Sequence, residues 1–369
     1  MPGVLESAVF YEKHRAPHSC FRRRASMAMS VAAMVLSILL AALMGFAAHR
    51  SGVCTVKAVM ELVTTGRAFL LASFWRAALW VMVVDLVVYW AGGAQPIFGP
   101  AVRLSYWPFI GGVAFGMGAA MNKGCAFSTL NRLGGGDLGM LVTLIAFFLG
   151  SAAMIAYPIE AISGPVEQLP GLLMHRQDVV ALLTLMLVGW VIRRTWYLWK
   201  ERPHEQGPRQ MLLSERYRLS TGAALIGLSA GILFALQGAW LYTSTVRSLA
   251  AMAFDPTAGP SLDHLLLFAA VLFGIVVSVW QRRAFRLQAP GPVAAMRHFG
   301  GGMMMGVGAT MIPGGNDVLV LQTIPLLLPH AILAYLGVLL GIFLILVAMK
   351  FMRQEIKRLD CSGDICWED

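Results

Sequence analysis

A run of glycines that occurs twice in this chain constrains its fold more than any other feature. The first copy is Gly111-Gly112-x3-Gly116-x-Gly118-Ala119, and the second is Gly301-Gly302-x3-Gly306-x-Gly308-Ala309. Every glycine of the second copy lies 190 residues after its counterpart, since 301 − 111 = 190. Glycines at this spacing on one face of a helix allow a second helix to approach closely. The shared register therefore predicts an internal duplication built from tightly packed helices.

The duplication lies in a strongly apolar chain. Of the 369 residues, 58% are hydrophobic and only 13% are charged, and the mean hydropathy is +0.69. A soluble globular protein does not need this much apolar surface, so we predict an all-α, polytopic helical membrane protein embedded in a lipid bilayer. The net charge of +10 is typical of cytoplasmic loops rich in Lys and Arg, and it also fits an electropositive path for an anion. No basic module typical of nucleic-acid binding is present.

Apolar runs predict about nine membrane-spanning helices. We expect them at residues 26–48, 69–91, 106–121, 138–157, 179–199, 219–236, 262–280, 296–312 and 329–351. Four shorter segments are predicted to be intramembrane half-helices, near residues 55–62, 126–133, 241–251 and 316–324. Each half of the duplication has four spans, and one odd span joins them, so the second half enters the membrane from the opposite face. We therefore expect two inverted repeats, with a substrate site at their interface.

The predicted organisation along the chain has five parts. These are a polar leader at 1–25, the first membrane repeat at 26–157, a linking helix and polar cytoplasmic loop at 158–218, the second membrane repeat at 219–351 and a polar C-terminal tail at 352–369. Loops after odd-numbered spans carry most of the Lys and Arg residues. The positive-inside rule then places these loops and the C-terminus in the cytoplasm. Arg22, Arg23 and Arg24 at the end of the leader do not follow that rule.

Two cysteines stand where apolar segments are broken. Cys54 follows Gly52, and Cys125 follows Lys123 and Gly124. Irregular backbone at membrane depth is tolerated only inside protein or around a wet cavity, so both breaks are candidate sites. A neutral thiol is a weak hydrogen-bond donor that can hold the sulfur of an anion loosely, whereas a thiolate would repel the anion. The competing interpretation is that both cysteines are small packing residues, as most buried cysteines are.

The surroundings of the breaks add further candidates. The predicted half-helices would direct free N–H groups and partial positive charge inward. Lys123 either adds charge for an anion or is an interfacial lysine whose amine reaches the headgroups. Asn316 and Asp317 are expected to cap the last half-helix, with direct contact to a substrate as the alternative. Asp85 alone lies within a predicted span, and no chain of carboxylates for a proton relay is evident.

The segment Asn122-Lys123-Gly124-Cys125-Ala126-Phe127-Ser128-Thr129-Leu130 resembles the YeeE/YedE family of bacterial sulfur-compound transporters. The segment His49-Arg50-Ser51-Gly52-Val53-Cys54 and the glycine motif of the second half resemble it too. The resemblance implies a nine-helix, pseudo-twofold protein of the bacterial inner membrane that takes up thiosulfate. It also implies that cysteines in a constriction pass the ligand on by S–H···S contacts. Cys54 and Cys125 match two of these cysteines, but Gly314-Gly315-Asn316-Asp317 stands where the family usually has a third.

The predicted function is therefore uptake of thiosulfate or a related sulfur anion by a protein that is not an enzyme. The expected substrate path is lined by Gly52, Cys54, Lys123, Gly124, Cys125, Gly314, Gly315 and Asn316. One alternative is a membrane thiol oxidoreductase that uses the two cysteines. Another is a non-transporting subunit that docks a sulfur-handling partner, such as a cytoplasmic sulfur-carrier protein.

The sequence predicts no cofactor and no metal site. It has no CxxC, ATP-binding or other cofactor motif. Cys361 and Cys366 lack the accompanying histidines of a typical metal site. The five cysteines also show no spacing typical of a disulfide framework.

Overall fold

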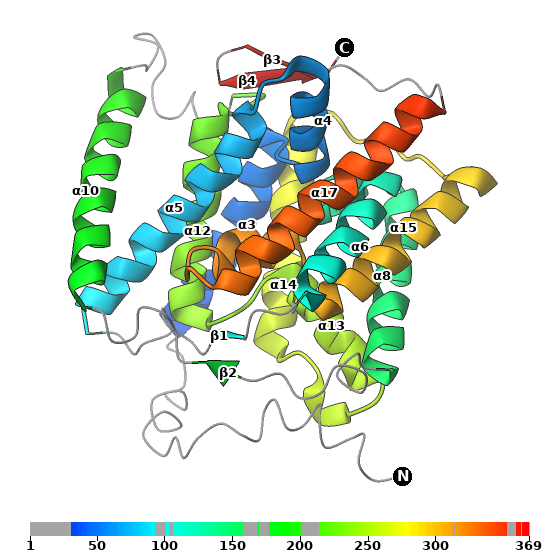
Figure 1. Ribbon diagram of the computed structural model, residues 1–369, viewed down its shortest axis with the longest axis horizontal. Coiled ribbons are helices and arrows are strands. Elements are labelled where there is room, and N and C mark those ends of the chain that lie inside the picture. The colour runs from blue at the N-terminus through cyan, green and yellow to red at the C-terminus, as the bar shows by residue number, and fades with distance from the viewer. Residues whose placement is uncertain are drawn as a thin grey trace. The chain divides into compact units, whose positions relative to one another are not determined.

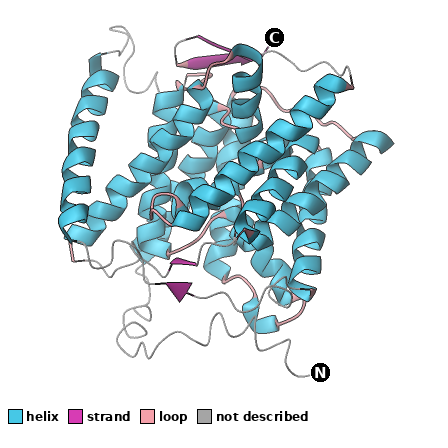
Figure 2. Cartoon of the chain, viewed as in Figure 1, coloured by secondary structure: helices cyan, strands magenta, loops and turns pink. Residues whose placement is uncertain are grey.

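The computed structural model describes residues 31–92, 101–102, 106–157, 168–169, 177–200, 214–312, 314–352, 359–362 and 364–368, and most of these residues are helical (Figures 1 and 2). The predicted leader at 1–25 and most of the polar loop before residue 214 lie outside the described residues. The chain divides into two compact units, Met1–Leu36 and Ser37–Asp369. The packing of the apolar helices lies within the second unit.

Helices occupy the positions at which the sequence predicts apolar segments. In the first half they are α3 (Val31–Ser51), α4 (Thr55–Thr65), α5 (Phe69–Trp90), α6 (Trp107–Met121), α7 (Ala126–Gly134) and α8 (Gly139–Ala156), followed by α10 (Gln177–Lys200). In the second half they are α12 (Leu219–Gln237), α13 (Tyr242–Met252), η1 (Pro256–Ala258), α14 (Leu262–Gln281), α15 (Pro292–Met311), α16 (Asn316–Val318), η2 (Leu319–Thr323) and α17 (Pro329–Phe351). The element η2 is a π-helix, a geometry that hydropathy does not predict.

Seven helices among the described residues are long and apolar enough to cross a membrane. The 15-residue α6 and the glycine-rich α15 are not among these seven. Many large apolar side chains of the long helices are exposed, and α10 illustrates this with Leu185, Met186 and Ile192. Exposed apolar side chains on this scale are costly in water and are satisfied by lipid. The structure therefore agrees with the predicted class of helical membrane protein.

The repeated glycines bring α6 and α15 into backbone contact. A Cβ atom added at Gly118 would lie 2.5 Å from the carbonyl oxygen of Gly301, and one added at Gly308 would lie 2.5 Å from that of Gly111. Residues early in one helix thus meet residues late in the other, so the two helices run antiparallel. The close approach that the glycine spacing predicts is confirmed, and each copy of the motif provides half of this contact.

The other glycines of the motif face two further helices. A Cβ atom at Gly116 of α6 would lie 2.1 Å from the carbonyl oxygen of Val338 in α17. A Cβ atom at Gly306 of α15 would lie 2.1 Å from the carbonyl oxygen of Phe147 in α8. The four helices therefore form one closely packed row, α17–α6–α15–α8, in which halves of the duplication alternate (Figure 1).

A second group of helices packs by the same device. Gly45 of α3 meets the Val271 carbonyl of α14, and Gly227 of α12 meets the Ala77 carbonyl of α5. The joining helix α10 packs on α5 through a small separate apolar cluster that includes Val180 and Leu187. Helices of the two halves are thus partners throughout the described part of the chain.

The C-terminal tail contains a structure that the sequence does not predict. Strands β3 (Leu359–Ser362) and β4 (Ile365–Glu368) form an antiparallel hairpin, and a disulfide joins Cys361 to Cys366 across it. The cysteine spacing is not typical of a disulfide framework, so the sequence does not predict this pair. The two cysteines lie opposite each other because of the register of the hairpin. A smaller pair, β1 (Ala101–Val102) with β2 (Gln168–Leu169), accounts for the other described strands.

The hairpin caps a helix that lacks a side-chain cap from its own sequence. Asp364, in the hairpin turn, accepts hydrogen bonds from the Ser220 amide and hydroxyl, and its carbonyl accepts one from the Leu219 amide. Arg76 of α5 also donates to the Asp364 carboxylate over 3.4 Å. The first amides of α12 are therefore satisfied by residues at the far end of the chain.

We expect Gly116→Ala to destabilise the protein and Gly189→Ala to leave it unchanged or stabilise it slightly. The new methyl at 116 would clash with the Val338 backbone, whereas a Cβ atom at 189 in α10 meets no atom within 4 Å. Overpacking costs about 1–3 kcal/mol, and an exposed Gly→Ala change in a helix gains up to about 1 kcal/mol. Thermal unfolding of the purified proteins in detergent measures both effects. Equal melting temperatures for the two variants would contradict the proposed packing.

Candidate functional site

Four helical segments begin near one another in the interior of the second unit. They are α4 after Cys54, α7 after Cys125, α13 after Leu241 and α16 after Gly315. Side chains from three of these starts are bonded together. Asn316 donates from Nδ2 to the Thr55 hydroxyl over 2.8 Å, and its Oδ1 accepts from the Ala126 amide over 3.3 Å. Asn316 therefore connects the second half to both thiol-bearing segments of the first half.

The two predicted thiols meet at this point. Cys54 is 1% exposed and Cys125 is 0% exposed, both are free of disulfide bonds, and the two thiols interact directly. The Thr55 amide also donates to the sulfur of Cys125 over 3.4 Å. The thiols lie 71 positions apart in sequence (125 − 54 = 71), and the two breaks bring them into one closed cluster. The sequence predicts both residues but not their direct contact.

The second half contributes a carboxylate next to the thiols. The Thr243 hydroxyl donates to both oxygens of Asp317, over 2.7 and 2.9 Å, and accepts from the Gly315 amide over 3.1 Å. Asn316, Asp317 and Thr243 are all fully buried. The Gly315 amide thus already has a partner, so it does not point at open space. A Cβ atom at Gly315 would lie 2.5 Å from the Asp317 carboxylate, so this position has no room for a side chain.

The backbone repeats at the breaks with the offset of the duplication. Cys125 has φ −77° and ψ −176°, and Gly315, 190 positions later, has φ −82° and ψ −175°. Gly52 and Gly238, which both end a long helix, have positive φ values of 61° and 76°. Only glycine adopts such angles without strain, which explains why both halves end these helices at glycine. The backbone angles therefore match between Cys125 and Gly315, and the positive φ values match between Gly52 and Gly238.

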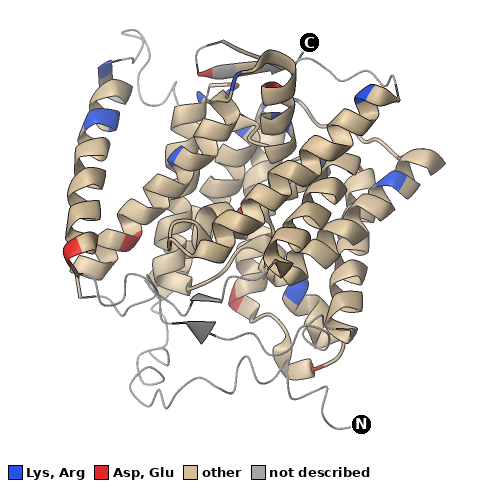
Figure 3. Cartoon of the chain, viewed as in Figure 1, with Lys and Arg blue, Asp and Glu red and all other residues tan. Residues whose placement is uncertain are grey.

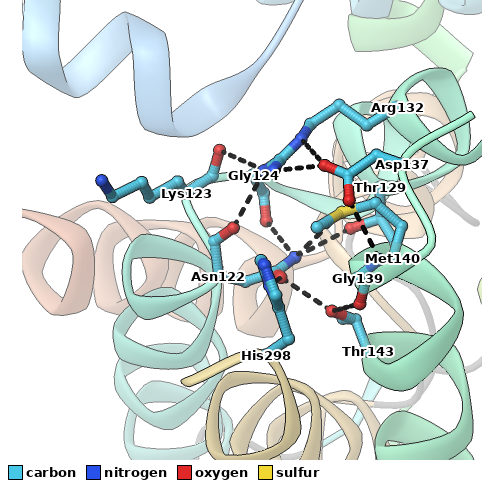
Figure 4. A network of polar contacts seen from close by, with 10 residues as sticks. All are labelled: Asn122, Lys123, Gly124, Thr129, Arg132, Asp137, Gly139, Met140, Thr143 and His298. Carbon is cyan, nitrogen blue, oxygen red and sulfur yellow. Dashed lines mark hydrogen bonds and ion pairs between the residues drawn. The ribbon is translucent and has the colours of Figure 1, made fainter. Parts of the chain in front are cut away.

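The remaining predicted residues lie around this cluster at different depths. Gly124 precedes Cys125 and is buried, and Gly314 precedes Gly315 with φ 141°. Lys123 has φ 55°, an uncommon value for a residue with a side chain. Its side chain is exposed, and its amine points away from the neighbouring polar network in Figure 4. Of the predicted positions, the structure therefore brings Cys54, Cys125, Gly315 and Asn316 together and leaves Lys123 at the periphery.

A buried network that the sequence does not predict supports the break after α6 (Figure 4). The Oδ1 atom of Asn122 accepts from the Thr143 hydroxyl and lies 2.7 Å from Nδ1 of His298, and its amide group donates to the Thr129 hydroxyl. His298 comes from α15, so the network also joins the two halves. A single histidine near the start of a glycine-rich helix gives no sequence signal for this long-range contact.

The turn after α7 is held by an ion pair. Arg132 donates to Asp137 over 2.7 Å and also reaches the carbonyl oxygen of Asn122 (Figure 4). The other oxygen of Asp137 accepts from the amide of Gly139, the first residue of α8. These contacts fix the end of α7, and thereby the position of Cys125 at its other end.

A third polar cluster lies at the end of α3, two residues before Gly52. Arg50 is buried and donates to the Ser278 hydroxyl, to Gln281 and to the Ser214 carbonyl. The Tyr217 amide donates a hydrogen bond to the Arg50 carbonyl oxygen. Burial raises the pKa of the Tyr217 hydroxyl, although the positive charge of Arg50 acts in the opposite direction. The cluster anchors the end of α3 to α14 and to the segment before α12.

Apolar side chains complete the surroundings of the thiols. Tyr242 stacks on Phe268 and meets Phe127 edge-on, and Trp240 is buried with its indole N–H on the Thr245 hydroxyl. Two small apolar pockets beside η2 are both lined by Phe74 and Val320, and neither is lined by a thiol. Within the described residues, no three His, Cys, Asp or Glu side chains are grouped so that they could hold a metal ion.

Comparison with known proteins agrees with this geometry. A family model described as sulphur transport matches residues 50–344, from the end of α3 into α17. The chain is 24% identical over 310 residues to the thiosulfate transporter TsuA of Escherichia coli strain K12, which covers 77% of this chain and 86% of the relative. The matched region includes both thiols and both glycine copies, and the seven apolar helices of the described residues are long enough to cross a membrane. The chain therefore belongs to the sulphur transport family, YeeE/YedE, and is a multi-pass membrane protein.

Proposed function

We propose that this protein transports thiosulfate or a related sulfur anion into the cell. The observation that carries the proposal is the buried contact between Cys54 and Cys125 at the point where helical segments from both halves begin. The thiosulfate transporter TsuA, as a relative of this chain, supports the choice of substrate. The same family membership supports a transporter over a membrane oxidoreductase or a docking subunit.

The thiols suit a sulfur anion that has to be released again. A neutral thiol donates weakly, so it can contact the terminal sulfur of thiosulfate without holding it tightly. The starts of α4, α7 and α13 add the partial positive charge of their helix dipoles, which offsets the charge of a dianion in a region of low dielectric constant. Because the cluster is fully buried, passage of the anion requires the packed segments to separate. The protein thus acts by a conformational change rather than as an open pore.

The architecture in this proposal has nine spans, two inverted repeats and four intramembrane half-helices. The seven apolar helices, together with α6 and α15, make up the nine spans. The antiparallel contact of the two glycine motifs supports the inversion, because Gly111 meets Gly308 while Gly301, its counterpart, meets Gly118. Such an exchange of partners is the sign of a twofold axis. The paired backbone angles at Cys125 and Gly315 support the half-helices.

The glycines and Lys123 have separate roles in the proposed path. Gly52, Gly124, Gly314 and Gly315 keep the backbone close to the anion at three of the four breaks. Lys123, with its exposed side chain, would attract the anion at one mouth of the path. Asn316 would keep the two halves in register beside the thiols.

The proposed location is the bacterial inner membrane with a cytoplasmic C-terminus. Among the described residues, most of the Lys and Arg seen in Figure 3 lie in its upper half, where β3 and β4 also lie. The positive-inside rule makes this the cytoplasmic side. A cytoplasmic sulfur-carrier protein is a candidate partner for this side, although residues 201–213 of the polar loop lie outside the described residues.

Uptake of radiolabelled thiosulfate tests the function. The purified protein is reconstituted into proteoliposomes and is also expressed in bacterial cells that lack their own sulfate and thiosulfate uptake systems. We expect time-dependent uptake that unlabelled thiosulfate abolishes. Competition by sulfate, sulfite and selenium oxyanions defines the substrate class. Absence of uptake from well-folded protein in liposomes would refute the proposal.

We expect Cys125→Ala to lower thiosulfate uptake more than tenfold while the amount of protein in the membrane stays nearly the same. The loss of a hydrogen bond to a charged ligand costs about 1.5–3 kcal/mol, which corresponds to a factor of ten or more. Ser151→Ala is the matched control, because it removes one buried polar atom far from the thiols. Normal uptake by Cys125→Ala would show that this cysteine has only a packing role.

Gly315→Ala and Gly315→Cys should both reduce uptake, with alanine no worse than cysteine. Either side chain would collide with the Asp317 carboxylate and with Thr243. Gly291→Ala serves as the control, since a Cβ atom there meets nothing within 4 Å. Uptake by Gly315→Cys above the wild-type rate, with Gly315→Ala inactive, would favour a third thiol in the path instead.

A further inference from the structure

A fully buried carboxylate lies at the centre of the proposed anion path. Asp317 is 0% exposed and follows Asn316, which is itself bonded to Thr55 and to the start of α7. Both carboxylate oxygens accept from one hydroxyl, that of Thr243. No ion pair to Asp317 is present among the described residues. A carboxylate in this position is expensive to keep ionised, because burial without a cation leaves its charge uncompensated.

The groups that face Asp317 cannot supply that compensation. The elements packed against α16 are α13, α7 and η2. The titratable groups they bring near Asp317 are Tyr242 from α13 and Cys125 at the start of α7, and η2 carries none. Helix α13 also carries Arg247 and α7 carries Arg132, which pairs with Asp137, but neither arginine is bonded to Asp317. Cys54 and Tyr335 border the same cluster through Cys125. All four are acids, which are neutral or negatively charged, so none of them adds a positive charge when a dianion arrives.

An ionised Asp317 would therefore oppose the substrate that the thiols are arranged to contact. Repulsion between two anions is strong in a dry interior, where little water screens them. The conflict disappears if the carboxylate carries a proton while the anion passes. A proton suits this position better than a sodium ion, because Asp317 and Thr243 offer too few oxygens to replace the hydration shell of a metal ion.

Protonation of Asp317 would change the hydrogen bonds of the Thr243 hydroxyl. A hydroxyl has one hydrogen to donate and two lone pairs that accept. With Asp317 ionised, that hydrogen points at the carboxylate, and the Gly315 amide occupies one lone pair. With Asp317 protonated, the new carboxyl O–H can donate to the second lone pair of Thr243. The Thr243 hydrogen is then released and can donate to an oxygen of the anion.

We propose that Asp317 is the proton-binding group of a proton-coupled anion uptake. In each cycle an O–H bond forms on the carboxylate from a proton of the outer solution, and the same proton is released to water on the inner side with the anion. This inference rests on the proposed function, and it adds the coupling ion and the residue that carries it.

The test is uptake of radiolabelled thiosulfate into proteoliposomes in sodium-free buffer, with and without an inside-alkaline pH gradient. For one proton per anion, a gradient of about one pH unit raises the final accumulation by about tenfold. We expect this rise for the wild type and for Asp85→Asn, which neutralises a buried acid of α5. We expect Asp317→Asn, which keeps an acceptor for Thr243, to take up thiosulfate without any response to the gradient.

Thr243→Val provides a second variant in case Asp317→Asn does not fold. It removes the hydroxyl that stabilises the ionised carboxylate, so the pH midpoint of uptake should move to higher pH, whereas Thr243→Ser should leave it in place. The proposal is overturned if Asp317→Asn or Thr243→Val responds to pH as the wild type does, or if wild-type uptake ignores the gradient. A wild-type protein that takes up no thiosulfate under any gradient would instead refute the transport function itself.

Discussion

Direct contact between the backbones of α6 and α15 is the interaction on which the rest of the structure depends. Where Gly111, Gly118, Gly301 and Gly308 meet, no side chain separates the two halves of the chain. In lipid, helices gain little from apolar burial against one another, so such close packing is a main source of association. The contact also fixes the heights at which both helices end. The breaks after them, and with them Cys125 and Gly315, are placed by this packing.

Polar groups around the breaks are bonded across the halves. Asn316 joins Thr55 and Ala126, and Asn122 joins His298 and Thr143. The bonds from Asn316 and the contact between Asn122 and His298 would be lost if the halves separated, and an unpaired polar group in the membrane interior is costly. The thiols are different, because their contacts are weak. The site thus combines a firmly bonded frame with a pair of side chains that can exchange partners at little cost.

The sequence predicts the positions of the helices and the breaks because both depend on local composition. It also predicts the close approach at the glycines, since the repeated spacing identifies one face of each helix. It does not predict His298 as a partner of Asn122, because the two lie 176 positions apart and His298 belongs to no recognisable motif. The π-helical turn η2 and the Cys361–Cys366 disulfide depend on packing and strand register. The Asp317–Thr243 contact joins two different predicted half-helices, and no sequence pattern links one to the other.

The cap of α12 has a consequence for how the protein is made. The ribosome synthesises α12 well before the hairpin, and Asp364 is added 145 residues after Leu219 (364 − 219 = 145). Until then the first amides of α12 have no partner from the hairpin, and only water or other groups can satisfy them. Completion of this helix end therefore belongs to the last stage of biogenesis. A tag or fusion that prevents the hairpin from folding would leave the start of the second half open in an otherwise inserted protein.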